Sequence, residues 1–509
     1  MKTTAAIPAL NQKVFLNGCD LNCDILADIV SQNLPVGVQK SCWEIVQQQR
    51  DIVDEIVRKK VPAYGVTTGV GSQKDFVVSE KEVAQYNMRL VRAHATRVPG
   101  PLLSGEAIRA ALIIMINEFA QGHSGVSQDL LQTMTEACNK ENMPEIDASG
   151  SVGASDLVPL AQMAVWLLSL DAAKARNLPK AKETLSLINH NAVTLALGAF
   201  AIVELKQLLA LNDLTAAATM EGFRGNVSAL SEAVNRVHRR PGQRASAARI
   251  RSHLKGSKLW TQGEARFLQD PLSFRTLSQV HGAVDEIVGQ SEEIWNQELN
   301  SVNDNPIIDP EIRGPNSHAN MDTTRLTLAL DTLRQALGKL ADLSGERIQK
   351  LQWPTFSGLP TGLAEGDGHA TGGVQFLNLG HIAASLVTST KIWARPHLLI
   401  SVGQLADGVE DTSGHALHAV HDLQRQIDTG WKIVAIELSI AIWAIHRRRI
   451  PIFDLGDGVR KAYEAICPVL PIGKEGDEPF DLACVIEVAK TLVKSESNLE
   501  DQRSKCEPF

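Results

Sequence analysis

The sequence has few aromatic residues, no cysteine spacing typical of a metal site and no long apolar run, and each shortage narrows the class of protein. Only 5% of the 509 residues are aromatic and β-branched alternation is scarce, so the composition favours an all-helical chain. The seven cysteines are odd in number and scattered, so we expect free thiols and no structural zinc or other metal. No span approaches the roughly 18 uninterrupted apolar residues of a membrane helix, and Met1 to Pro8 is too short for a signal peptide. We therefore expect a cytoplasmic protein without a membrane partner.

Charge gives no general attraction to nucleic acid, because the net formal charge is −8. Two local basic stretches, Arg236 to Lys258 and His446 to Arg449, are more typical of solvated helix faces or subunit contacts. With 44% hydrophobic residues, the chain is long enough to bury a large core.

The stretch from Gly150 to Leu160 places glycines and small hydroxyl residues directly before the most apolar helix that the sequence predicts, Leu157 to Leu170. Gly150 and Gly153 permit backbone angles that other residues resist, and Ser155 or Asp156 can cap the helix. A helix N-terminus of this kind suits a group that accepts electrons or an anion. Taken alone, the stretch is also typical of a Gly-rich loop that caps a core helix.

Each of the other motifs also has an ordinary structural explanation when it is taken singly. Tyr64 lies in a glycine-containing loop that could close over a site. His94 lies on a predicted helix and is alone more typical of a satisfied core or surface histidine, and Glu410 belongs to an acidic pair that usually marks a solvated face. The remaining motifs are Lys182 to Asn189, Gln269 to Arg275 and Glu298 to Pro306.

In chain order these motifs resemble those of the histidine, phenylalanine and tyrosine ammonia-lyase and aminomutase family, from Tyr64 to Glu410. The resemblance implies a mainly α fold with a central bundle of long antiparallel helices. It also implies a homotetramer with active sites shared between subunits. We expect an N-terminal part with the lid and electrophile loops over 1–195, the bundle over 196–455 and a helical cap over 456–509.

The resemblance implies a role for each matching residue. Tyr64 matches the base that removes the substrate's β-proton, Arg275 the clamp on its carboxylate, and Glu410 a glutamate near its amine and imidazole. The positions assigned to substrate binding are His94, Asn189, Gln269, Arg275 and Asn305. The pair Ala93-His94 is nearest to the histidine-specific members, so a histidine-like substrate is favoured.

In this family an Ala-Ser-Gly triplet cyclises into 4-methylidene-imidazol-5-one, the electrophile that captures the substrate amine. The triplet in register here is Ala154-Ser155-Asp156, because the family's Gly before the Asp is absent. An aspartate side chain crowds a turn where the family has only hydrogen, so we expect no fully competent ring. An Ala-Ser-Gly triplet at 148–150 is out of register, and a third interpretation is that the written sequence renders a condensed ring imperfectly.

Three functions remain open from the sequence. The first is an ammonia-lyase or aminomutase acting on an aromatic or imidazole amino acid. The second is an acid-base enzyme on the same scaffold without the electrophile. The third, a non-catalytic paralogue, is favoured by the missing glycine, by Leu272 where the family has Tyr, and by Ser317 where it has Phe.

Overall fold

The computed structural model describes residues 13–79, 82–140, 142–364, 373–472 and 478–504. The N-terminal segment for which no signal peptide is predicted lies outside these residues, as does Cys506, whereas the other six cysteines are free thiols. The chain divides into two compact units. The first comprises Met1–Val203, Ser291–Asp331 and Pro396–His421, and the second comprises Glu204–Gln290, Thr332–Arg395 and Asp422–Phe509. The division into three parts drawn from the sequence stays a prediction.

Helices dominate both units, and short 3-10 turns join many of them. The α-helices are α1 Cys23–Ser31, α2 Lys40–Lys59, α3 Val83–His94, α4 Gly105–Phe119, α5 Gln128–Cys138, α6 Leu157–Ser169, α7 Asp171–Ala175, α8 Glu183–Ile188, α9 Ala192–Phe223, α10 Glu232–Val237, α11 Pro241–His253, α12 Leu272–Arg275, α13 Leu277–Glu298, α14 Thr324–Gln352, α15 Pro354–Ser357, α16 Val374–Trp393, α17 Ala416–Arg447, α18 Asp457–Ile466 and α19 Leu482–Ser504. The mainly helical fold class predicted from the sequence is confirmed.

The strands of the described residues form two small pairs. β1 (Val14–Leu16) pairs in parallel with β2 (Val36–Val38), and β3 (Ile307–Asp309) pairs antiparallel with β4 (Gly314–Asn316). α2 begins at Lys40, because Val38 is still paired with Leu16.

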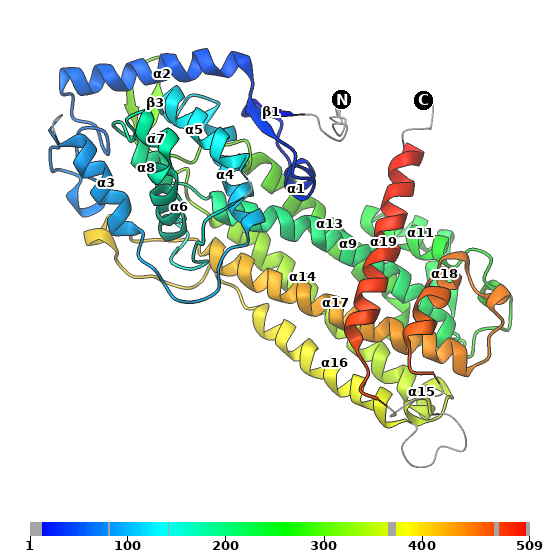
Figure 1. Cartoon of the computed structure of the whole chain (residues 1–509). Helices are drawn as coiled ribbons and strands as arrows, with labels where there is room; N and C mark the ends of the chain where they lie inside the picture. The colour runs from blue at the N-terminus through cyan, green and yellow to red at the C-terminus, as the bar shows by residue number, and fades with distance from the viewer. Residues whose placement is uncertain (1–12, 80–81, 141, 365–372, 473–477, 505–509) are drawn as a thin grey trace. The chain divides into compact units, whose positions relative to one another are not determined.

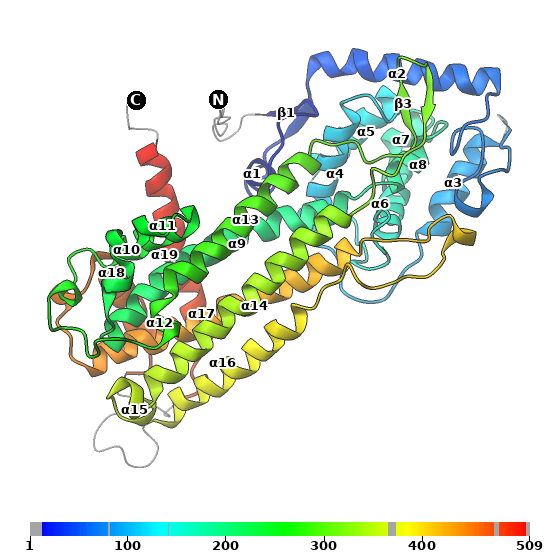
Figure 2. The same cartoon turned by 180° about the vertical axis from the view of Figure 1, so that it is seen from behind.

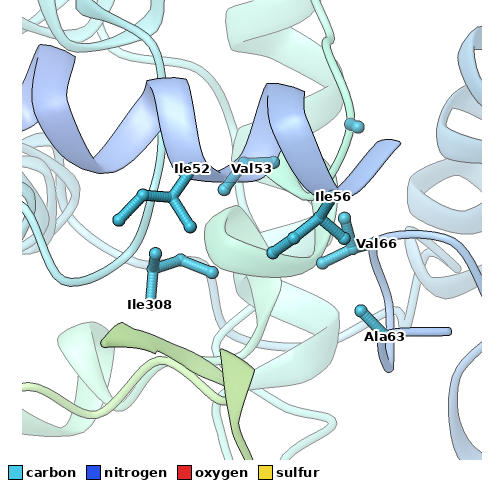
Figure 3. Packing of buried hydrophobic residues seen from close by; sticks show 7 residues of the cluster. Ile52, Val53, Ile56, Ala63, Val66 and Ile308 are labelled. Atoms are coloured by element: carbon cyan, nitrogen blue, oxygen red, sulfur yellow. The ribbon is translucent and has the colours of Figure 1, made fainter. Parts of the chain in front are cut away.

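A hydrophobic cluster of the first unit holds the base of the loop that contains Tyr64 (Figure 3). Ala63 and Val66, on either side of Tyr64, are 4% and 3% exposed. They belong to one cluster with Ile52 and Ile56 of α2 and with Ile308 of β3. Burial of its neighbours therefore fixes the position of Tyr64 in the fold.

Two helices of the first unit form much of its core. Every residue of α4 from Ala107 to Phe119 is buried, which is the pattern of a helix surrounded by protein on all sides. In α6 most of the apolar positions are buried as well. The buried helix predicted after the Gly-rich stretch is thus confirmed, ending at Ser169 rather than Leu170.

In the second unit, long helices lie side by side in both views (Figures 1 and 2). Side-chain hydrogen bonds give their directions. From the N-terminal to the C-terminal end, Arg334 and Arg347 of α14 meet Gln426 and Glu437 of α17, so these two helices run parallel. α16 runs antiparallel to α14, since Gln349 of α14 bonds to Gly380 and Arg334 to Trp393. The successive long helices α14, α16 and α17 therefore alternate in direction, as the antiparallel bundle predicts, and this alternation leaves α14 and α17 parallel.

Two helical segments are long and apolar enough to span a membrane by length and composition, namely Glu183–Phe223 and Ala416–Arg447. In their most apolar windows, 72% and 83% of the residues are buried inside the protein. Such burial is the pattern of core helices, whose apolar sides contact other helices.

Candidate active site

The first unit contains a pocket of about 920 Å³. Its wall comes from the Tyr64 loop, α3, the end of α8, the segment after β4 and the loop before α17. Six of the residues that the sequence singles out line it, namely Tyr64, His94, Ala154, Asn189, Asn305 and Glu410. The fold thus brings together motifs that are up to about 350 positions apart in the sequence.

Tyr64 is half-buried in this pocket, and its hydroxyl accepts a hydrogen bond of 3.0 Å from the backbone N–H of Gly71. Gly65 is required next to it, because φ is +65° and an added Cβ would lie 2.1 Å from Leu185. Burial raises the pKa of the Tyr64 phenol, the Gly71 N–H partly offsets the rise, and the charge of Glu410 adds to it. Tyr64 is therefore a neutral phenol at neutral pH in these surroundings.

One face of α3 forms a wall of the pocket. Tyr86, Arg89 and Ala93 lie on it at spacings of three and four residues, and Leu90 and His94 follow Tyr86 at spacings of four. The Nδ1 atom of His94 pairs with the carbonyl oxygen of Leu90 at 2.8 Å, which orients the ring. Sequence reasoning found His94 but missed Tyr86 and Arg89. The signal that could have found them is the helical spacing of Tyr86, Arg89 and Ala93, which places them on one face of α3 beside His94.

Glu410 lies in the loop before α17, where its backbone is bridged to Leu405. Burial raises the pKa of this carboxyl group, and His94 partly offsets the rise. The influence of His94 on Glu410 and of Glu410 on Tyr64 means that the three groups share one electrostatic environment. A carboxylate and two aromatic side chains in such a pocket can accommodate a cation.

The Gly-rich stretch forms a tight loop at the edge of the pocket. Gly153 has φ of +94°, and an added Cβ would lie 2.4 Å from the backbone nitrogen of His415, so only glycine fits. Ser155 has φ of +73°, in the left-handed region that a residue with a Cβ rarely adopts, and its side chain is buried. Its hydroxyl donates a hydrogen bond of 2.7 Å to Oδ1 of Asn189.

Asp156 occupies the N-cap position of α6, but its side chain makes no cap hydrogen bond, so the capping role predicted for it is wrong. The carboxylate is fully buried and accepts hydrogen bonds from the backbone N–H and the hydroxyl of Thr194, each 2.8 Å long. Its backbone N–H donates to the carbonyl oxygen of His190 at 2.7 Å. Asp156 therefore fastens the loop to the start of α9. Burying a carboxylate without hydrogen-bond donors costs more free energy than leaving the helix end without a side-chain cap.

These contacts test whether the residues fit the family's electrophile. The family's ring closes through the backbone nitrogen of the residue after the serine, which is Asp156 here. That nitrogen is engaged with His190, and the attached side chain is buried against Thr194. Ring closure would break the first contact and displace a buried carboxylate. The in-register triplet does not fit 4-methylidene-imidazol-5-one, and the upstream triplet at 148–150 is not part of the pocket wall.

A chain of hydrogen bonds positions the two asparagines of the site. Asn189 accepts from Ser155 and donates through Nδ2 to the carbonyl oxygen of Asn305 at 3.0 Å. The side-chain oxygen of Asn305 in turn accepts from the backbone N–H of His318 at 2.8 Å. Both asparagines are thereby held at the pocket edge in fixed orientations.

Two buried ionic pairs lie among the residues around this chain. Lys182 Nζ is 2.6 Å from Asp304 Oδ2, with both side chains fully buried. His190 Nε2 is 2.7 Å from Glu118 Oε2. Burial opposes the charged form of His190, but the charge and the hydrogen bond of Glu118, together with the charges of Asp304 and Asp156, outweigh it and raise the pKa of His190. The backbone carbonyl of His190 also accepts from the N–H of Asp156, so this pair lies next to the altered triplet.

Gln269 and Arg275 do not line the pocket and belong to the second unit. Arg275 Nε donates to the carbonyl oxygen of Asp270 at 2.7 Å. With the Gln269 amide oriented so that its oxygen faces the guanidinium, that oxygen accepts from Nη1 at 2.8 Å and from Nη2 at 3.2 Å. Within the residues that the structure describes, no cluster of His, Cys, Asp or Glu has the arrangement of a metal site.

Fold and pocket together define a carbon–nitrogen lyase, and the chain belongs to the aromatic amino acid lyase family, whose model matches residues 21–467. It is 31% identical over 502 residues to a histidine ammonia-lyase of Caldanaerobacter subterraneus subsp. tengcongensis, covering 94% of this chain and 97% of that protein.

Two solved structures resemble it closely. One is the ergothioneine-degrading enzyme ergothionase of Treponema denticola in complex with desmethyl-ergothioneine sulfonic acid, with a TM-score of 0.86, 28% identity and coverage of 96% of this chain and 99% of that one. The other is a tyrosine aminomutase of Streptomyces globisporus, with a TM-score of 0.85, 26% identity and coverage of 95% and 97%. The chain is therefore an ammonia-lyase-like enzyme, and the family predicted from its motifs is confirmed.

Proposed function

We propose that this enzyme removes the α-nitrogen of an imidazole-bearing amino acid by β-elimination and gives an α,β-unsaturated acid. The observation that carries the proposal is the convergence of Tyr64, His94 and Glu410 in one pocket. The similarity to a histidine ammonia-lyase supports the imidazole group as the substrate's side chain.

Tyr64 is the proposed base. Burial and the charge of Glu410 raise the pKa of its phenol, so it needs a nearby positive charge before it can accept the β-proton. A cationic nitrogen on the substrate, next to Tyr64 and Glu410, supplies that charge and favours the ionised form of both groups. The elimination then moves the β-proton to Tyr64, forms the Cα=Cβ double bond and breaks the Cα–N bond, with its electron pair leaving on nitrogen.

Glu410 and His94 are proposed to hold the two ends of the substrate that carry nitrogen. The Glu410 carboxylate attracts the cationic nitrogen, and the His94 ring faces the imidazole. Asn189 and Asn305 orient the substrate through their amide groups. For Gln269 and Arg275 the family's roles stay predictions.

A second candidate differs in the leaving group and is favoured by the altered triplet. In the family the electrophile captures a free amine, a step that requires a nitrogen lone pair. A trimethylammonium nitrogen has no lone pair to donate and needs no capture, because it leaves directly as neutral trimethylamine. Ergothioneine, which the Treponema denticola enzyme degrades, is such a betaine, built on a sulfur-substituted histidine.

The residues of the pocket wall also favour a betaine as the substrate. The pocket is lined by Phe76, Tyr64 and Tyr86 together with the Glu410 carboxylate. Two of the three tyrosines of the chain therefore lie at this pocket. Aromatic faces beside a carboxylate are the usual surroundings of a bound quaternary ammonium group. We therefore favour a trimethylated histidine derivative over free histidine.

The test supplies purified protein with histidine, N,N,N-trimethylhistidine or ergothioneine. The near-ultraviolet absorbance of the unsaturated acid and the released amine are measured. Release of trimethylamine from at least one betaine, with little ammonia from histidine, is the expected result, and Tyr64→Phe should abolish it. Rapid ammonia release from histidine would favour the first candidate, a β-amino acid product an aminomutase, and no reaction a non-catalytic paralogue.

We further propose that the protein is a cytoplasmic homotetramer, as the resemblance implies. Exposed apolar side chains support association: Leu268 is 96% exposed and Leu399 is 85% exposed. A negative net charge and a pocket of amino-acid size give no reason to expect nucleic acid as a partner.

A further inference from the structure

The basic stretch that begins at Arg236 lines a second hollow, which lies within the second unit. This hollow has a volume of about 750 Å³ and is formed by α10, α11 and the turn that joins them. Among the described residues of its wall, Glu232 is the one carboxylate, whereas four are arginines, namely Arg236, Arg239, Arg244 and Arg251. A guanidinium group stays charged at any physiological pH. The wall therefore carries three positive charges that no carboxylate of the wall balances.

Three of these guanidinium groups are available for a ligand. Within the part of the chain that the structure describes, the side chains of Arg236, Arg239 and Arg244 are exposed and make no hydrogen bond or ion pair. Arg249 of α11 differs, because its Nε is 2.7 Å from Oδ2 of Asp213. The same helix thus carries one arginine with an acidic partner inside the protein and others whose donors are unused.

Hydrogen bonds fix the two helices that carry the arginines. Oδ1 of the buried Asn235 in α10 accepts from Nε2 of the buried Gln243 in α11 at 2.8 Å. Arg251 Nη1 donates to the carbonyl oxygen of Leu230 at 2.8 Å, which orients this side chain and leaves its charge unbalanced. Because the helices are held in this way, a ligand loses less affinity to the ordering of its site.

The surface of α11 between the arginines is open. Arg244, Ala248 and Arg251 follow one another at spacings of four and three residues, so they share one face of the helix. Ala245 and Ala248 are exposed and also line the hollow. These small side chains leave room for a ligand to approach the helix between the guanidinium groups.

We propose that this hollow binds a small molecule that carries a chain of phosphate groups. A guanidinium binds phosphate oxygens through two parallel hydrogen bonds, and several linked phosphates are needed to contact several arginines at once. The volume lies in the range of small-molecule sites. Among the described residues of the wall none is aromatic, so no ring is present to stack on a nucleobase. The phosphate chain alone therefore carries the recognition, whether it belongs to a nucleotide or to an inorganic polyphosphate.

The proposal does not depend on the function proposed above, because none of these residues lines the pocket of Tyr64. The experiment titrates the purified full chain with phosphate, tripolyphosphate, AMP and ATP in a calorimeter, without divalent cations. Tripolyphosphate and ATP should bind with similar affinity, and at least about 10-fold more tightly than phosphate and AMP, because each further charged contact adds about that factor. Added salt should weaken the binding.

Variants locate the site. Arg244→Ala and Arg236→Ala should each weaken tripolyphosphate binding by about 10- to 100-fold. Arg244→Lys should keep only part of the affinity, because lysine has the charge without the planar fork. Arg240→Ala is the matched control, since Arg240 is an exposed neighbour that does not line the hollow. Circular dichroism should show that all variants fold like the wild type.

Three results would overturn the proposal. The first is a wild-type protein that binds tripolyphosphate no more tightly than phosphate, including one that binds neither. The second is a loss in Arg240→Ala as large as in Arg244→Ala, which would mean a diffuse attraction to the basic surface. The third is binding of ATP and AMP without binding of tripolyphosphate, which would place the recognition on the nucleoside.

Discussion

Insertion of one glycine between Ser155 and Asp156 tests the interpretation of the altered triplet. Asp156 is fastened to His190 and Thr194 by three hydrogen bonds of 2.7 to 2.8 Å. Hydrogen bonds to a buried carboxylate are strong, so we expect them to persist when a residue is inserted. The loop on the Gly153 side must then accommodate the new residue, which spans at most about 3.6 Å. The insertion would create Ala-Ser-Gly directly before Asp156 and leave that anchor in place.

The expected cost in stability is modest. Ordering one more residue costs about 1–2 kcal/mol, well below the roughly 5–15 kcal/mol that keeps a typical domain folded. The variant should therefore fold, and urea denaturation should show a slightly lower midpoint with an unchanged slope. A larger loss would mean that the loop cannot accommodate the residue.

The variant should form the ring and gain function. Intact mass should fall by two water molecules, a near-ultraviolet band should appear, and histidine should release ammonia and urocanate. Turnover should stay limited because Leu272 cannot act as the family's tyrosine does. The matched control is the same insertion with Ser155→Ala, which cannot form the ring. Strong deamination of histidine by the unmodified protein, abolished by Ser155→Ala, would refute the reasoning.

Three further predictions concern charge, stability and assembly. Burial raises the pKa of Glu410, so its carboxylate forms only as the pH rises through that raised value. We therefore expect kcat/KM to rise with pH on the acid side. Glu410→Gln should lower kcat/KM about 10- to 100-fold and remove its dependence on pH in that range. Glu437→Gln leaves the fully buried Arg347 guanidinium, 2.6 Å from the carboxylate, without its counter-charge, and should lower the free energy of unfolding by about 3–5 kcal/mol in urea titrations; a change below 1 kcal/mol would contradict this. Light scattering at micromolar concentration should give the mass of a tetramer, and a monomer would refute the proposed assembly.

Family, helical fold class and six residues of the pocket wall could be predicted from the sequence, because each depends on local patterns. Tyr64 stands between the buried Ala63 and Val66, and His94 follows a motif at a helix end. Each motif is a short run of neighbouring residues, so it can be recognised without knowing the tertiary contacts. The missing glycine before Asp156 could also be read directly, since it is a change in sequence spacing.

What Asp156 does could be decided only by the tertiary structure. Its local position predicts a helix cap, yet its carboxylate binds Thr194, 38 residues away, because burial makes those donors the better partners. Tyr86 likewise joins the pocket wall only when the fold sets α3 beside the loops of Tyr64 and Glu410. Local spacing determines which side chains lie together on one face of a helix or loop. Long-range packing determines which of these side chains share a pocket and which are hydrogen-bonded to other parts of the protein.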